Sequence, residues 1–161
     1  METYLGLNLG NGTQENAIQE SKAVSAAAKG NLLGVEIGNE PDLFGRHEGD
    51  RHAGYDYDAY LGEYRTYRDA LRKAIPGIAF AGPDAAGVTG WVTRFAVDED
   101  RGINLLTHHY YREGENPTST IDKLLHTDPK LAPILAKLTP RAAASVSLTP
   151  GLPPPENERM R

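Results

Sequence analysis

Short apolar runs alternate along this chain with longer segments in which apolar residues recur at helical spacing. The runs of strand length lie at 3–9, 32–39, 78–82 and 103–110. The segments with a helical pattern lie at 13–29, 56–75, 87–100 and 118–138. Such alternation with short connections is typical of parallel strands joined by crossover helices. The pattern therefore predicts an α/β fold with four parallel strands in sequential order and helices on the outer face of the sheet.

The strand predicted at 32–39 ends on a carboxylate. Its residues are mostly apolar, and the run is too short for a typical helix. Pro41 donates no amide hydrogen and favours an extended backbone at Glu40, so the strand should stop there. In parallel α/β folds the edge where the strands end carries the chemistry. The simpler interpretation is a turn after a strand, because Asn, Pro and Asp are all turn formers.

The clearest helix is predicted at 56–75. Tyr60, Tyr64, Tyr67 and Leu71 recur in it at the spacing i, i+4, i+7 and i+11, which places them on one helical face. An aromatic stripe of this kind is usually part of a hydrophobic core. We therefore assign these four side chains to the core.

Four short motifs occur in a fixed order along the chain. They are Gly6-Leu7-Asn8-Leu9, Glu36-Ile37-Gly38-Asn39-Glu40-Pro41-Asp42, Gly82-Pro83-Asp84 and Thr107-His108-His109-Tyr110-Tyr111. With these motifs the chain resembles retaining glycoside hydrolases built on a (β/α)8 barrel, and most of all glycoside hydrolase family 79, the β-glucuronidase and heparanase-like enzymes. The resemblance covers residues 3–139 and implies a partial TIM barrel, from about strand 3 to helix 6. A complete barrel typically takes about 250 residues, and this chain has 161.

The resemblance implies which residues carry the chemistry. Retaining glycosidases use two carboxyl groups about 5 Å apart, one as acid and then base, the other as nucleophile. Glu40 matches the acid/base residue, whose proton must be available near neutral pH through burial and a neighbouring negative charge. Asn39 matches the amide that binds the sugar 2-hydroxyl. The implied substrate-binding set is completed by Asn8, Asp84, His108 and Tyr110.

The second carboxylate has no match in this sequence. The nucleophile of the family lies at the end of strand 7, and no such segment is found here. Glu113 and Glu115 follow the last predicted strand and do not match a strand-7 motif, while Glu156 and Glu158 lie in a proline-rich tail. We therefore expect the chain to be catalytically incomplete by itself.

Alternation along the fourth strand predicts which side chains share a face. A period of two places Leu106, His108 and Tyr110 together, and by resemblance this face points into the barrel. Glu36 lies four residues before Glu40 on the same face but deeper. We interpret it as a buried carboxylate with His108 as its candidate partner. For His108 itself, a satisfied internal histidine is the simpler interpretation.

The composition changes after Thr139. The last 22 residues contain five prolines and no aromatic residue, and such a segment cannot bury enough apolar surface to become ordered. We therefore divide the chain into a partial barrel, 1–139, and a Pro-rich disordered tail, 140–161. A change of reading frame near Thr139 is the preferred explanation, and a natural disordered tail is the alternative.

Charge and composition exclude several classes of function. The net charge of -5, without any Lys/Arg-rich block, argues against nucleic acid as a partner. The chain has no cysteine, and His47 and His52 are not placed for a shared metal ion, so we expect neither a metal nor a cofactor. No apolar run approaches the roughly 20 residues that span a membrane. The N-terminus lacks the pattern of a signal peptide, and the localisation stays open.

The expected partner is carbohydrate, a β-glucuronide or related glycoside, together with self-association through open barrel edges. Three hypotheses stay open. The first is a glycosidase fragment that lacks its nucleophile. The second is a carbohydrate-binding remnant without catalysis. The third is an unrelated small α/β domain in which Asn39 and Glu40 form only a turn.

Overall fold

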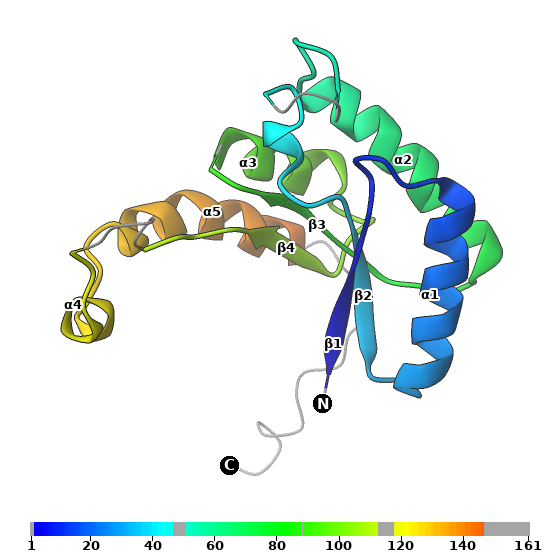
Figure 1. Cartoon of the computed structure of the whole chain (residues 1–161), viewed down its shortest axis with the longest axis horizontal. Helices are drawn as coiled ribbons and strands as arrows, with labels where there is room; N and C mark the ends of the chain where they lie inside the picture. The colour runs from blue at the N-terminus through cyan, green and yellow to red at the C-terminus, as the bar shows by residue number, and fades with distance from the viewer. Residues whose placement is uncertain (1, 47–50, 88, 113–117, 147–161) are drawn as a thin grey trace.

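Four parallel strands form one sheet whose order follows the chain (Figure 1). The computed structural model describes residues 2–46, 51–87, 89–112 and 118–146. The strands are β1 (Thr3–Leu7), β2 (Leu32–Ile37), β3 (Phe80–Ala85) and β4 (Leu105–His108), paired in the order β1-β2-β3-β4. Each of these pairings is parallel. The predicted sequential, parallel sheet is confirmed.

Helices connect the strands and cover one face of the sheet. They are α1 (Gln14–Ala28), the short 3-10 helix η1 (Pro41–Leu43), α2 (Tyr57–Ala74), α3 (Thr89–Asp98), α4 (Ile121–Leu125) and α5 (Leu131–Val146). α1 packs beside α2, and α3 packs beside α5. α1, α2 and α3 share a single buried core with the strands, so these three helices lie on the same face.

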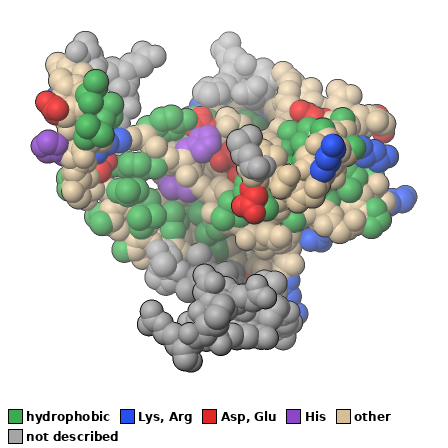
Figure 2. Space-filling model, turned by 90° about the horizontal axis from the view of Figure 1, so that it is seen from below, with side chains coloured by type: hydrophobic (Ala, Val, Ile, Leu, Met, Phe, Trp, Pro, Cys, Tyr) green, Lys and Arg blue, Asp and Glu red, His purple; other side chains and the backbone are tan. Residues whose placement is uncertain are grey.

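α4 lies away from the sheet on one side of the molecule, and α5 leads from there back to α3 (Figure 1). Figure 2 shows hydrophobic side chains, in green, on this side. Large apolar side chains are exposed here, with 74% of the Ile121 surface and 79% of the Leu125 surface accessible. We call this surface the apolar flank, and its members are Ile121, Leu124, Leu125, Leu131 and Leu135.

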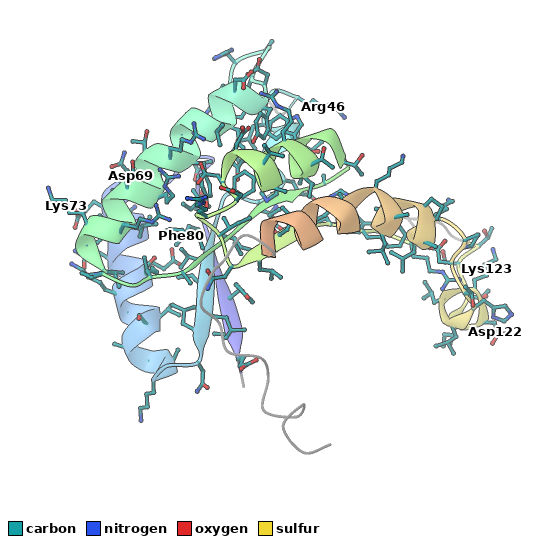
Figure 3. All side chains as sticks on the ribbon, turned by 180° about the vertical axis from the view of Figure 1, so that it is seen from behind. Arg46, Asp69, Lys73, Phe80, Asp122 and Lys123 are labelled. Carbon is teal, nitrogen blue, oxygen red and sulfur yellow. The ribbon has the colours of Figure 1, made fainter. Side chains whose placement is uncertain are left out.

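The tyrosine stripe of α2 lies in the core, as predicted. Tyr60, Tyr64 and Leu71 are fully buried, and Tyr67 is partly buried against the same cluster. Asp69, on the opposite side of α2, points outward in Figure 3 and has an exposed side chain. Burial of one helical face of large aromatic side chains is the main contribution of α2 to stability.

Aromatic contacts join α2 to α3 above the sheet. Tyr64 meets Phe95 edge-on with ring centroids 4.8 Å apart, and Tyr60 stacks on Trp91 at 5.6 Å. Phe80 of β3 is buried between the sheet and the helices (Figure 3). Aromatic pairs at these distances contribute about 0.5–1.5 kcal/mol beyond the area they bury.

Side chains cap the starts of two helices. Thr13 and Asp56 each accept a hydrogen bond from the backbone amide three residues on, at 3.2 and 3.0 Å, and so act as N-caps. At the end of α1, Gly30 has a φ of 89°. The C-cap itself is Lys29, with a left-handed backbone at φ 50°.

Two elements differ from the predicted bounds. β3 runs over Phe80–Ala85 instead of 78–82, because its pairing with β4 continues to Ala85, across an irregularity at the left-handed Asp84. The segment 118–138 is divided into α4 and α5 near Asp128-Pro129, and α5 continues to Val146. The boundary proposed at 139 therefore falls inside a helix, and the remainder of the predicted tail lies outside the described residues.

Tyr60 and Tyr64 provide a matched test of the core. The Tyr60 hydroxyl donates to the carbonyl of Ile37 at 3.3 Å, whereas the buried Tyr64 hydroxyl has no hydrogen-bond partner among the described residues. We expect Tyr60→Phe to lower the free energy of unfolding by about 0.5–1.5 kcal/mol, the net worth of one hydrogen bond. Tyr64→Phe should leave it unchanged or raise it, since it removes an unsatisfied buried hydroxyl. Urea unfolding of the three proteins is the measurement, and equal losses in both variants would contradict this assignment.

Candidate active site

Glu40 directly follows the loop at the carboxyl end of β2. Its amide N–H donates to the carbonyl of Asp84 at 3.0 Å and so joins the ends of β2 and β3. Both residues have a left-handed backbone, with φ of 50° at Glu40 and 58° at Asp84. The extended backbone predicted at Glu40 is wrong, because this hydrogen bond and the 3-10 turn that begins at Pro41 outweigh the bias from the proline. Left-handed residues other than glycine are strained, and they cluster at functional sites.

His109, the first residue after β4, bridges two carboxylates. Its Nδ1 lies 2.7 Å from Oε1 of Glu40, and its Nε2 lies 2.9 Å from Oδ1 of Asp84. Each ring nitrogen can donate to its carboxylate only when it carries a proton. The bridge therefore favours the imidazolium form, and it ties together the carboxyl ends of β2, β3 and β4.

Tyr111 and Thr107 complete the polar contacts around this bridge. The Tyr111 hydroxyl donates to Oε1 of Glu40 at 3.0 Å. The Thr107 hydroxyl oxygen accepts from the amide of Asp84 at 3.1 Å, and the Thr107 side chain acts to lower the pKa of the neighbouring Glu36. The predicted pairing of Glu36 with His108 is therefore wrong, since Thr107 is the neighbour that faces Glu36.

The charges at this edge move the pKa values in different directions. The hydrogen bond with His109 is the largest influence on Glu40 and holds its pKa below the usual value. Burial raises the pKa of Asp84, against the opposing charge of His109. Burial, and after it the charge of Asp84, raises the pKa of Glu36. For His109, burial acts to lower the pKa, but the hydrogen bond to Glu40 and the charges of both carboxylates outweigh it and raise the value.

The pKa of Glu40 is thus displaced in the direction opposite to that needed by a general acid. We expected burial and a negative neighbour to keep its proton available near neutral pH. The Glu40 side chain is only partly buried, and its closest charged neighbour is the imidazole of His109. In this chain Glu40 is therefore set up as a carboxylate, which can act as a base.

His108 and Tyr110 lie on the other face of the sheet edge. Nδ1 of His108 pairs with the carbonyl of Ala85 at 2.8 Å, and the Tyr110 hydroxyl donates to the carboxylate of Asp128. Together with Leu106 they line a hollow of about 300 Å³ beneath α5. The prediction that this set faces Glu40 is wrong, and the odd-numbered residues of the motif meet it instead. The sequence around this strand contains no signal for the choice, because Leu105 and Leu106 are both apolar and have opposite parity.

Asn8 and Asn39 lie in a separate hollow of about 480 Å³ at the ends of β1 and β2. We call it the asparagine hollow, and its lining is Gly6, Leu7, Asn8, Leu9, Gly10, Asn11, Asn39 and Phe44. Asn8 pairs with Asn11, through Nδ2 to Oδ1 at 2.7 Å. Of the six predicted site residues, Glu40 and Asp84 meet through His109, Asn8 and Asn39 line this hollow, and His108 and Tyr110 lie elsewhere.

Two further classes of site were searched for within the described parts of the chain. No group of three or more His, Asp or Glu side chains is placed there to hold a metal ion. None of the helices described there has the length and apolar character needed to cross a membrane.

No protein-family model matches this sequence, and no curated protein matches it. Solved structures do match, among them the crystal structure of CelM2, a bifunctional glucanase-xylanase protein from a metagenome library. That likeness has a TM-score of 0.54 at 18% sequence identity, and it covers 84% of this chain and 36% of that chain. This chain therefore spans about a third of that structure. At this identity the likeness concerns the fold, which is α/β with four parallel strands and is consistent with a partial TIM barrel.

The bridge predicts how His109 titrates. In Glu40→Gln the shape is nearly kept but the charge is lost, so the pKa of His109 should fall towards its ordinary value. Glu20→Gln, an exposed change on α1, is the matched control and should leave the pKa of His109 unaltered. NMR titration of the histidine ring protons measures both, and an unchanged His109 pKa in Glu40→Gln would rule out the bridge.

The same pKa shift predicts a pH dependence of stability. The pKa of His109 is raised in the folded chain above its ordinary value of 6.5. Its stabilising contribution is therefore complete below about pH 6.5 and is lost as the pH rises through the folded value. We expect His109→Gln to remove this loss, as seen by comparing urea midpoints of the two proteins at pH 6 and above.

Proposed function

We propose that the carboxyl edge of the sheet binds a glycoside and supplies the acid/base half of a retaining glycoside hydrolase. The observation that carries this proposal is the position of Glu40. Its carboxylate is held at the strand ends by His109 and Tyr111, directly after the amide of Asn39. The likeness of the fold to a glucanase-xylanase supports a reaction at an O-glycosidic bond. The four sequence motifs favour the β-glucuronidase or heparanase-like type, acting on a β-glucuronide or related glycoside.

Each residue at the edge has a role in this proposal. In an enzyme with a nucleophile across the site, Glu40 would protonate the leaving glycosidic oxygen while the nucleophile attacks the sugar, and would later take a proton from the water that releases the sugar. Asn39 hydrogen-bonds a sugar hydroxyl, since its amide both donates and accepts. His109 and Tyr111 orient the Glu40 carboxylate, and Asp84 anchors His109. The substrate-binding role of His108 and Tyr110 remains a prediction from the resemblance.

The second carboxylate is the missing part of this mechanism. A glycosyl-enzyme intermediate needs a nucleophile about 5 Å from the acid/base, with the sugar between the two. Asp84 is the carboxylate joined to Glu40, but the His109 ring lies between them, where the sugar would have to sit. Glu113 and Glu115 lie outside the described residues. We therefore propose that this chain binds glycosides without turning them over.

Two alternatives predict different observations. A carbohydrate-binding remnant would bind glycosides without any requirement for the charge of Glu40. An unrelated α/β domain would be favoured by a doubly wound sheet with Glu40 buried and paired. The sequential strand order and the partial exposure of Glu40 both argue against that third hypothesis.

The activity prediction is an absence of turnover. We expect the 161-residue chain to hydrolyse an aryl β-glucuronide no faster than background, and no faster than its Glu40→Gln variant. Release of the aryl group, followed by absorbance, is the measurement. If the parent chain is active and the variant is not, the chain contains its own second carboxylate. Glu113→Gln and Glu115→Gln are then the first variants to test, because these two carboxylates follow the fourth strand along the chain.

Self-association is the second prediction here. The strands β1 and β4 form open edges of the sheet among the described residues, and the apolar flank is exposed. We expect the chain to sediment as a mixture of oligomers at micromolar concentration. Leu125→Glu, at the most exposed member of the flank, should shift the mixture towards monomer. A monodisperse monomer in the parent chain would contradict this expectation.

A further inference from the structure

The asparagine hollow is lined by three side-chain amides and by backbone that carries no side chain, at Gly6 and Gly10. Asn8, Asn11 and Asn39 line it, together with the exposed Gly6 of β1. No charged side chain is found in its described lining. Its volume of about 480 Å³ falls in the range of ligand pockets, about 300–1,000 Å³.

From this lining we infer that the hollow binds an uncharged sugar unit, next to the glycoside that the proposed function places at Glu40. The inference rests on that proposed function and adds a second sugar-binding position with a stated preference in charge. Asn39 and Glu40 are consecutive residues, so the hollow and the candidate active site share a border.

The amides in the hollow keep hydrogen-bonding capacity for a ligand. Each asparagine side chain can make up to four hydrogen bonds. Asn8 uses one N–H towards Asn11 at 2.7 Å, and its oxygen accepts from the backbone amide of Asn11 at 3.2 Å. The amide of Asn39 makes no hydrogen bond within the described part of the chain and is exposed. Groups that both donate and accept match sugar hydroxyls, which do the same.

Contacts from α2 and from the loop before it hold in place the wall of the hollow that residues 6–11 form. Arg51 donates to the carbonyls of Leu9, at 2.9 Å, and of Gly10, and its guanidinium also pairs with Glu63 at 3.0 Å. The Tyr67 hydroxyl donates to the carbonyl of Gly12 at 2.9 Å. A wall already fixed in the free protein lowers the ordering cost of binding.

Glycine at position 12 keeps this loop tight. A Cβ there would lie 2.1 Å from the carbonyl oxygen of Asn8, so only glycine allows the turn that brings Asn8 and Asn11 together. The loop backbone therefore holds Asn8 and Asn11 together, and their hydrogen bond forms without a ligand.

The charges around the hollow favour an uncharged ligand. The nearest cation, Arg51, is directed to Glu63 and to backbone carbonyls. The border with the active site carries the carboxylate of Glu40. A uronate bound in the hollow would bring its charge next to a like charge, without a cation in the described lining to pair with it.

The test uses the whole chain labelled with 15N and two sugar probes. Cellotriose is the uncharged probe, and p-nitrophenyl β-glucuronide is the charged one. We expect cellotriose to shift the side-chain amide signals of Asn8, Asn11 and Asn39 in a saturable manner. Asn8→Ala should weaken its binding about two- to tenfold, the size expected for one uncharged hydrogen bond. Asn31→Ala, an exposed asparagine at the opposite end of the sheet, is the matched control and should change nothing.

A second variant blocks the hollow without relying on an amide. A Cβ built on Gly6 meets no atom within 4 Å, so Gly6→Leu has room to fold and should fill the hollow. We expect it to weaken cellotriose binding at least tenfold. Gly62→Leu, where a Cβ on α2 also meets no atom, is the control for adding a leucine to the surface.

The outcomes separate this inference from the proposed function. Cellotriose binding that is unaffected by Gly6→Leu and Asn8→Ala overturns the inference and leaves the glycoside site at Glu40 standing. Shifts of the Asn8 and Asn11 signals by the glucuronide that equal those by cellotriose also overturn it, because the preference for an uncharged sugar is then absent. The Asn39 signal is left out of this comparison, since Asn39 also borders the site at Glu40. If neither probe shifts any signal at the carboxyl edge, the proposed function fails and the inference falls with it.

Discussion

Burial of the Tyr60 side chain under the ends of β2 and β3 is the contact on which both the fold and the site depend. Its hydroxyl lies 3.3 Å from the carbonyl of Ile37 and 3.5 Å from that of Pro83, at full burial. A Cβ on Gly38 or on Gly82 would lie 3.8 Å from this same side chain. Gly38 has a φ of 99°, which side chains other than glycine rarely tolerate. The aromatic core therefore reaches directly to the edge that carries the candidate catalytic residues, and packing fixes their positions.

At that edge, the contact between His109 and Glu40 sets both the position and the charge of the Glu40 side chain. Glu36, Glu40 and Asp84 bring three carboxylates close together, and their mutual repulsion would oppose folding. The imidazolium of His109 offsets it by facing two of the three. The bond that holds Glu40 in place is also the largest cause of its lowered pKa. Geometry and acidity at this site cannot be changed independently, because one side chain controls both.

The periodicity of the sequence was enough to predict the layers of this fold. It was not enough to predict which face of the fourth strand is turned towards the helices. The stripe from Tyr60 to Leu71 has only one possible buried face, so its assignment was secure. The fourth strand begins with two leucines, Leu105 and Leu106, and a period of two then allows either face to be buried. The structure buries the Leu106 face, which brings His109 to Glu40 and turns His108 away. Long-range pairing across the sheet decides this choice, and no local pattern contains it.

The backbone at Glu40 was missed for a similar reason. A following proline favours an extended residue on average, but the amide of Glu40 has a specific acceptor in Asp84, 44 positions later in the chain. This hydrogen bond, together with the 3-10 turn that begins at Pro41 and the contact with His109, holds a left-handed conformation that costs about 1–3 kcal/mol. The backbone torsion angles of Glu40 are therefore determined by these contacts and not by the bias of the proline next to it in the sequence.

The lowered pKa of Glu40 follows from the charge that faces it in the described part of the chain, which is that of His109. In a retaining glycosidase the acid faces a nucleophilic carboxylate about 5 Å away, and that negative charge raises the pKa of the acid. In the described part of this chain the closest charge to Glu40 is the imidazole of His109, which acts in the opposite direction. A carboxylate added across the site would repel the charge of Glu40, and it would also compete for His109. Both effects raise the pKa of Glu40, so the same geometry that makes it a base here would make it an acid once a second carboxylate is present.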